Sequence, residues 1–425
     1  MKQWGQHVFR SVLAEHPDLW LWTGDVVYPD WPSSETEIEQ AYSLVGESEE
    51  ERALLADVPL VDGVFDDHDF GENDGGSSNV HRDLARRLFL DRVVRAHPNS
   101  PRRSQEGGLY TVRTFGLPPH QLKLLLLDTR FARDDHALPS PGGVWWLPKP
   151  GYCAALVRLA CAVLGVGRDH AGAMLSPAQW AWLERELTNS TAAAHLIVSS
   201  VQVLTSSPVV ESWGHFPRER DKLLHMLATL RPPGALLISG DVHYAELLGL
   251  GSSHEGEGKL LEVTSSGLTH SCGNSYFGRL LCGVVMRSFS GHRLLPGDPL
   301  RAGGWADSFV GSSYLGINFG TVQFDWDGTG APGENSRGPS MHLQLHGENG
   351  SVVLASRLPL GLDAEEEAAR WLSAQALPTV FDAAATVRMA CLGGGLFSML
   401  LCLLAQLYRR GWSSRASGGK KSHAQ

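Results

Sequence analysis

Residues 61–76 read VDGVFDDHDFGENDGG, an apolar run that ends abruptly in acidic side chains. Four aspartates and one histidine fall within nine residues: Asp66, Asp67, His68, Asp69 and Asp74. Side chains of like charge this close together repel one another unless a cation lies among them. The segment therefore predicts a buried strand followed by a cation-binding turn, at the strand end where open α/β sheets bind their ligands.

Four other apolar runs end in polar residues in the same way: DLWLWTGD at 18–25, QLKLLLLDTR at 121–130, AHLIVSSVQ at 194–202 and ALLISGDVH at 235–243. Short runs rich in Val, Ile and Leu are typical of strands buried on both faces. Amphipathic stretches between these runs predict helices at 79–97, 176–190 and 217–230. Because strands and helices alternate, the chain is predicted to have an α/β fold with mixed sheets.

The composition limits the possible functions. The chain has 425 residues, of which 43% are hydrophobic and 19% are charged, so it can form a large globular domain. Its net charge of -10 argues against a basic face for nucleic acid, and we expect no nucleic-acid partner other than as a substrate. We assign residues 1–360 to one domain with a Pro- and Gly-rich insertion at about 137–173.

A membrane anchor is predicted near the C-terminus. Residues 389–408, MACLGGGLFSMLLCLLAQLY, contain 20 residues without a charge, and a helix of this length spans a bilayer core of about 30 Å. A buried core helix is the alternative interpretation. An acidic juxtamembrane linker at 361–388 precedes the segment, and a basic tail at 409–425 follows it. The positive-inside rule then predicts a single-pass protein with its tail in the cytosol and its domain in the lumen or outside the cell.

Other sequence features bear on this topology. Asn189 and Asn349 begin N-glycosylation sequons, and Cys272 and Cys282 are spaced to form a disulfide in an oxidising compartment. The N-terminus carries no apolar leader, so a tail-anchored protein with a cytosolic domain is the alternative.

Hard oxygen and nitrogen ligands follow the predicted strands: Asp25 and Tyr28, Asp66 and Asp67, Asp128 and Arg130, and then Asp241, His243 and Glu246. This set suits Ca, Mg, Mn, Fe or Zn rather than Cu(I). Each piece alone is more typical of a turn or an ion pair, but their common position at strand ends favours a pair of metal ions. Such a pair lowers the pKa of a bound water and holds a phosphoryl group during in-line attack, while Arg130 is suited to grip phosphate oxygens.

At these residues the chain resembles the PhoD-like alkaline phosphatase/phosphodiesterase family, within the calcineurin-like metallophosphoesterases. The matching motifs run in family order and include LWLWTGDVVYPD at 19–30, VFDDHDFGENDGG at 64–76, LLLLDTRFARD at 124–134 and LISGDVHYAELL at 237–248. The resemblance covers residues 4 to about 270. It implies a four-layer αββα sandwich and a binuclear metal centre that hydrolyses phosphate mono- or diesters.

The resemblance also implies roles for single residues. Asp25 matches the bridging ligand, Tyr28 the tyrosine ligand of iron, and Asp241 with His243 the last ligand pair. A further ligand comes from Asp66 or Asp67 rather than His68, and Arg130 matches a phosphate contact. Iron with calcium is one metal set of the family, with Zn, Mn or Mg as alternatives.

One departure from the family concerns the N-terminus. Family members begin with a further strand that ends in a Gly-Ser-Cys type motif and supplies a metal ligand, and this sequence starts just after that place. We therefore expect a gene product truncated at its N-terminus. The alternative to a membrane-anchored phosphohydrolase is a catalytically impaired member that acts as a membrane-anchored binding protein.

The insertion at 137–173 holds Trp145 and Trp146 before a segment that is apolar nearly all round a helix. A surface helix normally has one polar face. One interpretation is a helix that covers the domain. The other is an element that touches the membrane, since Trp favours the bilayer interface, and it implies a lipid or membrane-bound phosphoester as substrate.

Overall fold

The computed structural model describes residues 7–29, 33–144, 146–147, 149–250, 260–289, 309–310, 313–328, 338–361 and 379–385. Within these ranges, no helix is both long and apolar enough to cross a bilayer. The predicted anchor at 389–408 and the basic tail lie outside the described residues.

The described chain is mixed α/β, as predicted. Its helices are α1 (Val8–Ala14), α2 (Glu35–Ser43), α3 (Glu49–Asp57), α4 (Arg82–Leu88), α5 (Pro150–Leu164), α6 (Pro177–Thr188), α7 (Pro217–Leu230) and α8 (Tyr276–Phe289). Its strands are β1 (Leu19–Thr23), β2 (Leu60–Val64), β3 (Thr111–Phe115), β4 (Leu122–Leu126), β5 (Ala194–Val198), β6 (Ala235–Ser239), β7 (Ala245–Leu250), β8 (Leu260–Ser265), β9 (Phe309–Val310), β10 (Ser313–Tyr314), β11 (Asn318–Asp325), β12 (Ser340–Gly347) and β13 (Val352–Pro359).

All five apolar runs that predicted strands form strands: β1, β2, β4, β5 and β6. The strands β5 and β6 are buried along their whole length, which confirms that both of their faces are covered. Ser176 caps α6 by accepting a hydrogen bond from the backbone N–H of Gln179, with Pro177 in the first turn. The helix predicted at 79–97 is shorter, because α4 passes at Phe89 into a π-helical turn that ends at Val93.

The strands form three sheets. A large mixed sheet has the order β3-β4-β5-β6-β8-β7-β10-β9, in which β4, β5, β6 and β8 are parallel. The strands β1 and β2 pair in parallel, and β11, β12 and β13 form an antiparallel sheet. Parallel pairing brings the carboxyl ends of neighbouring strands to the same edge, and the polar residues of the predicted site follow those ends.

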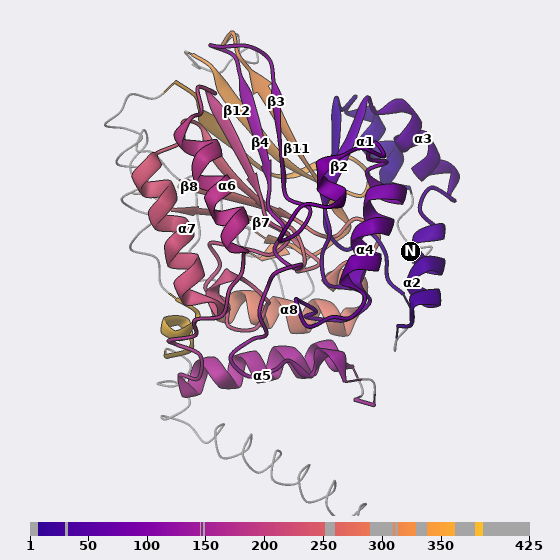
Figure 1. Ribbon diagram of the computed structural model, residues 1–425, viewed down its shortest axis with the longest axis vertical. Helices are drawn as coiled ribbons and strands as arrows, with labels where there is room; N and C mark the ends of the chain where they lie inside the picture. Colours follow the sequence, from indigo (N-terminus) through magenta and orange to yellow (C-terminus); the bar gives the residue numbers. More distant parts are fainter. Residues whose placement is uncertain are drawn as a thin grey trace, which may run out of the picture.

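Side chains of alternate residues pack on the two faces of the large sheet. Leu125, Ile197 and Leu237 pack against α6 and α7, while their neighbours Leu124 and Leu196 pack against β12 and β13. Figure 1 shows α6 and α7 over the near face of this sheet and β11 and β12 behind it. A third cluster joins β1 and β11 to α1, α2 and α3.

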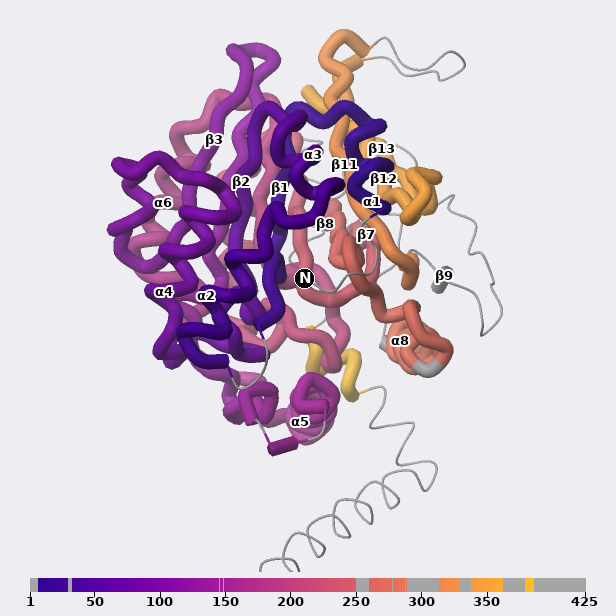
Figure 2. The backbone as a smooth tube through the Cα atoms, turned by 90° about the vertical axis from the view of Figure 1, so that its right-hand side faces the viewer, coloured from indigo at the N-terminus to yellow at the C-terminus, as the bar shows by residue number. Residues whose placement is uncertain are grey.

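The insertion contains helix α5, which lies at one end of the molecule, away from the sheets (Figure 2). Ala154 and Ala162 are buried, and Ala162 packs with Val380, Phe381 and Ala384 from the far end of the described chain. The predicted disulfide between Cys272 and Cys282 is present and joins helix α8 to the loop after β8.

Candidate metal centre

The turn after β1 carries Asp25 and Tyr28. Gly24 has a φ of +113°, and a Cβ there would lie 2.5 Å from the Cβ of Asp66, so only glycine lets the two strand-end turns meet. Asp25 has a φ of +53°, in the left-handed region that non-glycine residues rarely occupy. Non-glycine residues in this region cluster at functional sites, where the surrounding structure holds them in place.

Asp69 holds the turns after β1 and β2 together. One of its carboxylate oxygens accepts hydrogen bonds from the backbone N–H groups of Val26 and Val27 at 3.0 and 3.1 Å. The other oxygen accepts from the backbone N–H of Asp66 at 2.8 Å. Asp69 therefore positions the loops that carry Asp25 and Asp66, and its oxygens are occupied by backbone donors.

The turn after β6 supplies Asp241 and His243, with φ values of +69° and +59°. The loop after β8 supports this conformation, because Ser266 Oγ accepts from the N–H of His243 at 3.1 Å. The N–H of Cys272, a disulfide residue, donates to the carbonyl of His243 at 2.8 Å. The disulfide thus anchors the loop that holds the predicted histidine ligand.

These three turns bring the predicted residues into one cluster. The hydroxyl of Tyr28 donates to Asp25 Oδ2 at 2.8 Å and lies 3.2 Å from His243 Nε2. Ligand atoms of Asp25, Asp66, Asp67 and Asp241 all lie within 4.8 Å of one another, and so do those of Asp25, Asp67 and His68. Two overlapping groups that share Asp25 and Asp67 suit two neighbouring cations.

The electrostatics of the cluster support a cation. Burial is the largest effect on Asp66 and raises its pKa to about 6, although Arg130 acts in the opposite direction. Burial and then the carboxylates of Asp66 and Asp67 raise the pKa of Asp241 well above its usual range. The buried Asp66 Oδ2 has no hydrogen-bond partner in the described chain. These protein oxygens fit metal ions, which offset the repulsion among buried carboxylates.

Asp25 differs from its neighbours. Burial acts to raise its pKa, but the charges of His68 and His243 and the hydrogen bond from Tyr28 outweigh burial and lower it. The pKa of Tyr28 is raised by burial and by the Asp25 carboxylate. Without a cation, Asp25 therefore stays ionised and Tyr28 stays protonated near neutral pH.

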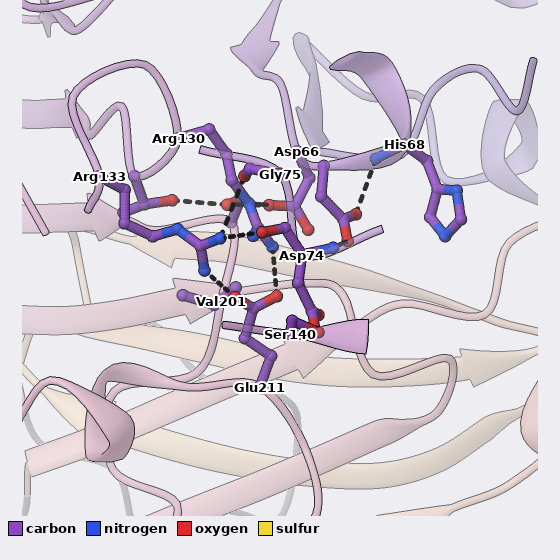
Figure 3. Close-up of polar contacts among 12 residues, drawn as sticks. Asp66, His68, Asp74, Gly75, Arg130, Arg133, Ser140, Val201 and Glu211 are labelled. Carbon is purple, nitrogen blue, oxygen red and sulfur yellow. Dashed lines mark hydrogen bonds and ion pairs between the residues drawn. The ribbon is translucent and has the colours of Figure 1, made fainter. Parts of the chain in front are cut away.

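Arg130 lies fully buried beside the cluster and is already held by protein carboxylates (Figure 3). Its Nε donates to Asp66 Oδ1, and its Nη2 lies 2.9 Å from Glu211 Oε2 without being aligned for a hydrogen bond. Ser200 Oγ also donates to Asp66 Oδ1, at 2.5 Å. Arg130 therefore orients Asp66, a contact that its predicted role at phosphate did not include.

A second buried group joins Asp74, His136 and Glu211. Cationic side chains already occupy it, because Arg158 Nη1 lies 2.7 Å from Asp74 Oδ2 and Arg133 Nη1 donates to Glu211. Burial and then the charge of Arg133 hold the pKa of His136 well below its usual range. The group is an ion-pair network, and we assign no metal to it.

Sequence reasoning ranked His68 behind its neighbours, placed Asp69 in the predicted turn without a role of its own, and did not select Glu211 or His270. The ring of His270 lies 4.3 Å from that of His243 and 4.9 Å from that of Tyr28. No local pattern marks Glu211 or His270, because neither directly follows a predicted strand of the site. Asp128 and Glu246 do follow strands, yet Asp128 accepts backbone hydrogen bonds from Arg130 and Phe131 in its own turn and from the distant Leu109. Glu246 accepts a hydrogen bond from Gln202.

Removing metal should destabilise the protein. Treatment with a chelator leaves Asp25, Asp66, Asp67 and Asp241 facing one another without a cation. The free energy of unfolding should therefore fall by about 3 kcal/mol, relative to a sample in which the free metal concentration is 100 times its dissociation constant. Denaturant unfolding with and without chelator measures this difference. Asp66→Asn removes one of the repelling charges and should reduce the loss. An unchanged unfolding curve after chelation would mean that the cluster holds no ion.

The chain resembles known proteins in sequence and in fold. A model of the PhoD-like phosphatase family matches residues 2–279. A solved structure of PhoD matches with a TM-score of 0.52 and 15% identity, over 92% of this chain and 75% of that one. A crystal structure of a 5'-nucleotidase precursor from Thermus thermophilus gives a TM-score of 0.27 and 11% identity, over 92% of this chain and 52% of that one. No curated protein sequence matches.

Proposed function

Because the chain belongs to the PhoD-like phosphatase family, we propose that it is a membrane-anchored, metal-dependent hydrolase of phosphate mono- or diesters. The observation that carries the proposal is the convergence of four aspartates, of which Asp66 and Asp67 are buried, with His68, Tyr28 and His243 at the carboxyl ends of β1, β2 and β6. Bound ions would supply an activated water and neutralise charge on the phosphoryl oxygens.

The protein groups have separate tasks in this proposal. Asp25 and Asp67 belong to both candidate cation groups, so we assign them to the shared position, with Asp66 and Asp241 on one side and His68 on the other. Tyr28 and His243 both lie near Asp25 Oδ2, and we assign them to the group that contains His68. Arg130 holds Asp66, and its Nη1, buried and without a hydrogen bond to the described chain, is the group we assign to phosphate.

We also propose the metal set and the layer order implied by the resemblance. A phenol oxygen, carboxylates and imidazole suit iron at Tyr28, and the all-carboxylate group suits calcium, with Zn, Mn and Mg as alternatives. The four-layer αββα sandwich is supported by the packing of α6 and α7 on the large sheet, of that sheet on β12 and β13, and of α1 to α3 on β1 and β11.

The test is hydrolysis of p-nitrophenyl phosphate and bis-p-nitrophenyl phosphate by the purified full chain, loaded separately with iron plus calcium, zinc, manganese or magnesium. We expect at least one metal set to give turnover that chelation abolishes. Tight metal binding without turnover under every condition would favour the alternative, a binding protein that has lost catalysis.

We propose that the domain lies in the lumen or outside the cell, with residues 389–408 as a single membrane span. Asn189 and Asn349 are exposed, and the Cys272–Cys282 disulfide suits an oxidising compartment. Peptide-N-glycosidase should therefore lower the mass of the full chain isolated from its native cells, and Asn189→Gln with Asn349→Gln should remove that shift. Unmodified asparagines together with cleavage of the domain by cytosolic protease would instead establish a tail-anchored topology.

A further inference from the structure

Helix α5 presents apolar side chains to solvent. Leu156 and Leu164 on the helix are 60% and 66% exposed, and Trp146 just before it is 68% exposed. Tyr152 and Val166 add to the same region and are also exposed. Large apolar side chains gathered on one surface element, rather than scattered singly, are typical of a contact surface.

The opposite side of α5 fixes the helix to the domain. Ala154 and Ala162 are buried, and Arg158 donates from Nε to the carbonyl of Val209 at 3.0 Å. Arg158 also pairs with Asp74 at 2.7 Å. The polar side chain of this helix thus points inward to an ion pair, and apolar side chains point outward, which is the reverse of an ordinary surface helix.

The path of the chain indicates what lies against this surface. Val380, Phe381 and Ala384 pack against Ala162 of α5, and Figure 2 shows this short C-terminal segment beside the helix. The uncharged stretch 389–408 begins five residues after Ala384. Five residues span at most about 18 Å even when fully extended. If 389–408 crosses a bilayer, α5 must therefore lie close to the surface of that bilayer.

We propose that Trp146, Tyr152, Leu156, Leu164 and Val166 form a surface that inserts into the lipid headgroup region; this rests on the proposed membrane span. Trp and Tyr side chains favour that interface, and the exposed Lys149 and Arg168 stand beside them to meet lipid phosphates.

The contact has a consequence for the metal centre. Asp74, the partner of Arg158, donates its backbone N–H to Asp67 Oδ2 at 2.6 Å. One ion pair and one hydrogen bond therefore connect the membrane-facing helix to a predicted metal ligand. The proposed contact would therefore orient the strand-end site relative to the bilayer.

The experiment uses the full chain in phosphatidylcholine vesicles, with a photo-crosslinking amino acid in place of Leu156. The control position is Leu117, which is 79% exposed and lies in the β3–β4 connection, at the end of the molecule opposite α5 (Figure 1). Irradiation followed by mass spectrometry should give at least ten times more lipid adduct at position 156 than at 117. Position 164 provides a second site if the first variant does not fold.

Three other outcomes would overturn the proposal. If positions 156 and 117 are labelled equally weakly, α5 does not contact lipid, and resistance of the same protein to alkaline extraction would show that the membrane span is still present. Release of the chain by alkaline extraction would remove the span on which the contact rests. Crosslinking of position 156 to a second copy of the chain would assign the surface to a protein interface. Hydrolysis of soluble p-nitrophenyl phosphate in the same samples reports on the proposed chemistry separately.

Discussion

Asp241→Asn and His243→Ala should each lower kcat/KM for p-nitrophenyl esters by at least about 100-fold in the full chain. Substitution of residues that only support metal ligands already costs about 10- to 100-fold in metal affinity or activity. Asp241 belongs to the four-aspartate group, and His243 Nε2 lies 3.7 Å from Asp25 Oδ2. Either change removes a group that we assign to the metal ions.

The same variants should bind less metal, measured by elemental analysis after dialysis. Their circular dichroism spectra should remain those of the wild type. Lower metal content with an unchanged spectrum would show that a ligand, and not the fold, has been lost. Matched controls are Asp83→Asn and His225→Ala, which change exposed residues of α4 and α7 and should keep full activity. Near-wild-type turnover in Asp241→Asn or His243→Ala would refute the assignment of that residue.

Glu211→Gln should destabilise the fold strongly. Glu211 is 2% exposed and lies against Arg130 Nη2 at 2.9 Å, Arg133 Nη1, and His136 Nε2 at 3.0 Å. Burial and then the charge of Arg130 lower the pKa of Arg133 to about 9, so a carboxylate is needed beside these two cations. Removing one partner of a buried ion pair costs about 3 to 5 kcal/mol, because the remaining charge stays buried without compensation.

Urea unfolding of wild type and Glu211→Gln measures this loss. The control is Glu39→Gln, whose carboxylate pairs with Arg87 at 3.5 Å where both side chains are more than half exposed. An exposed pair contributes about 1 kcal/mol or less, so the control should unfold close to the wild type. Equal effects of the two substitutions would show that the buried network does not stabilise the domain.

The sequence by itself determined the strands of the site and most of the side chains that gather at their ends. Buried strands require continuous apolar runs, and the end of each run is marked locally by a change to Gly and Asp. The strands β1, β2 and β6, and the residues that follow them, could therefore be located from the sequence alone. The N-cap of α6 was equally local, since Ser176 and the N–H that it binds are three residues apart. The anchor at 389–408 and the topology remain predictions, because they depend on residues outside the described structure.

Only the tertiary structure decided which distant groups meet. Glu211 lies 81 residues beyond Arg130 in the chain, and Ser200 lies 134 beyond Asp66, so no sequence period relates these pairs. The packing of Phe381 beside α5 likewise joins the end of the described chain to the insertion. Burial and charge at the site depend on such long-range contacts, which show that Arg130, predicted to contact phosphate, is also a buried partner of Asp66. Local sequence sets which side chains a strand end carries, whereas the packing of separate elements sets what each side chain touches.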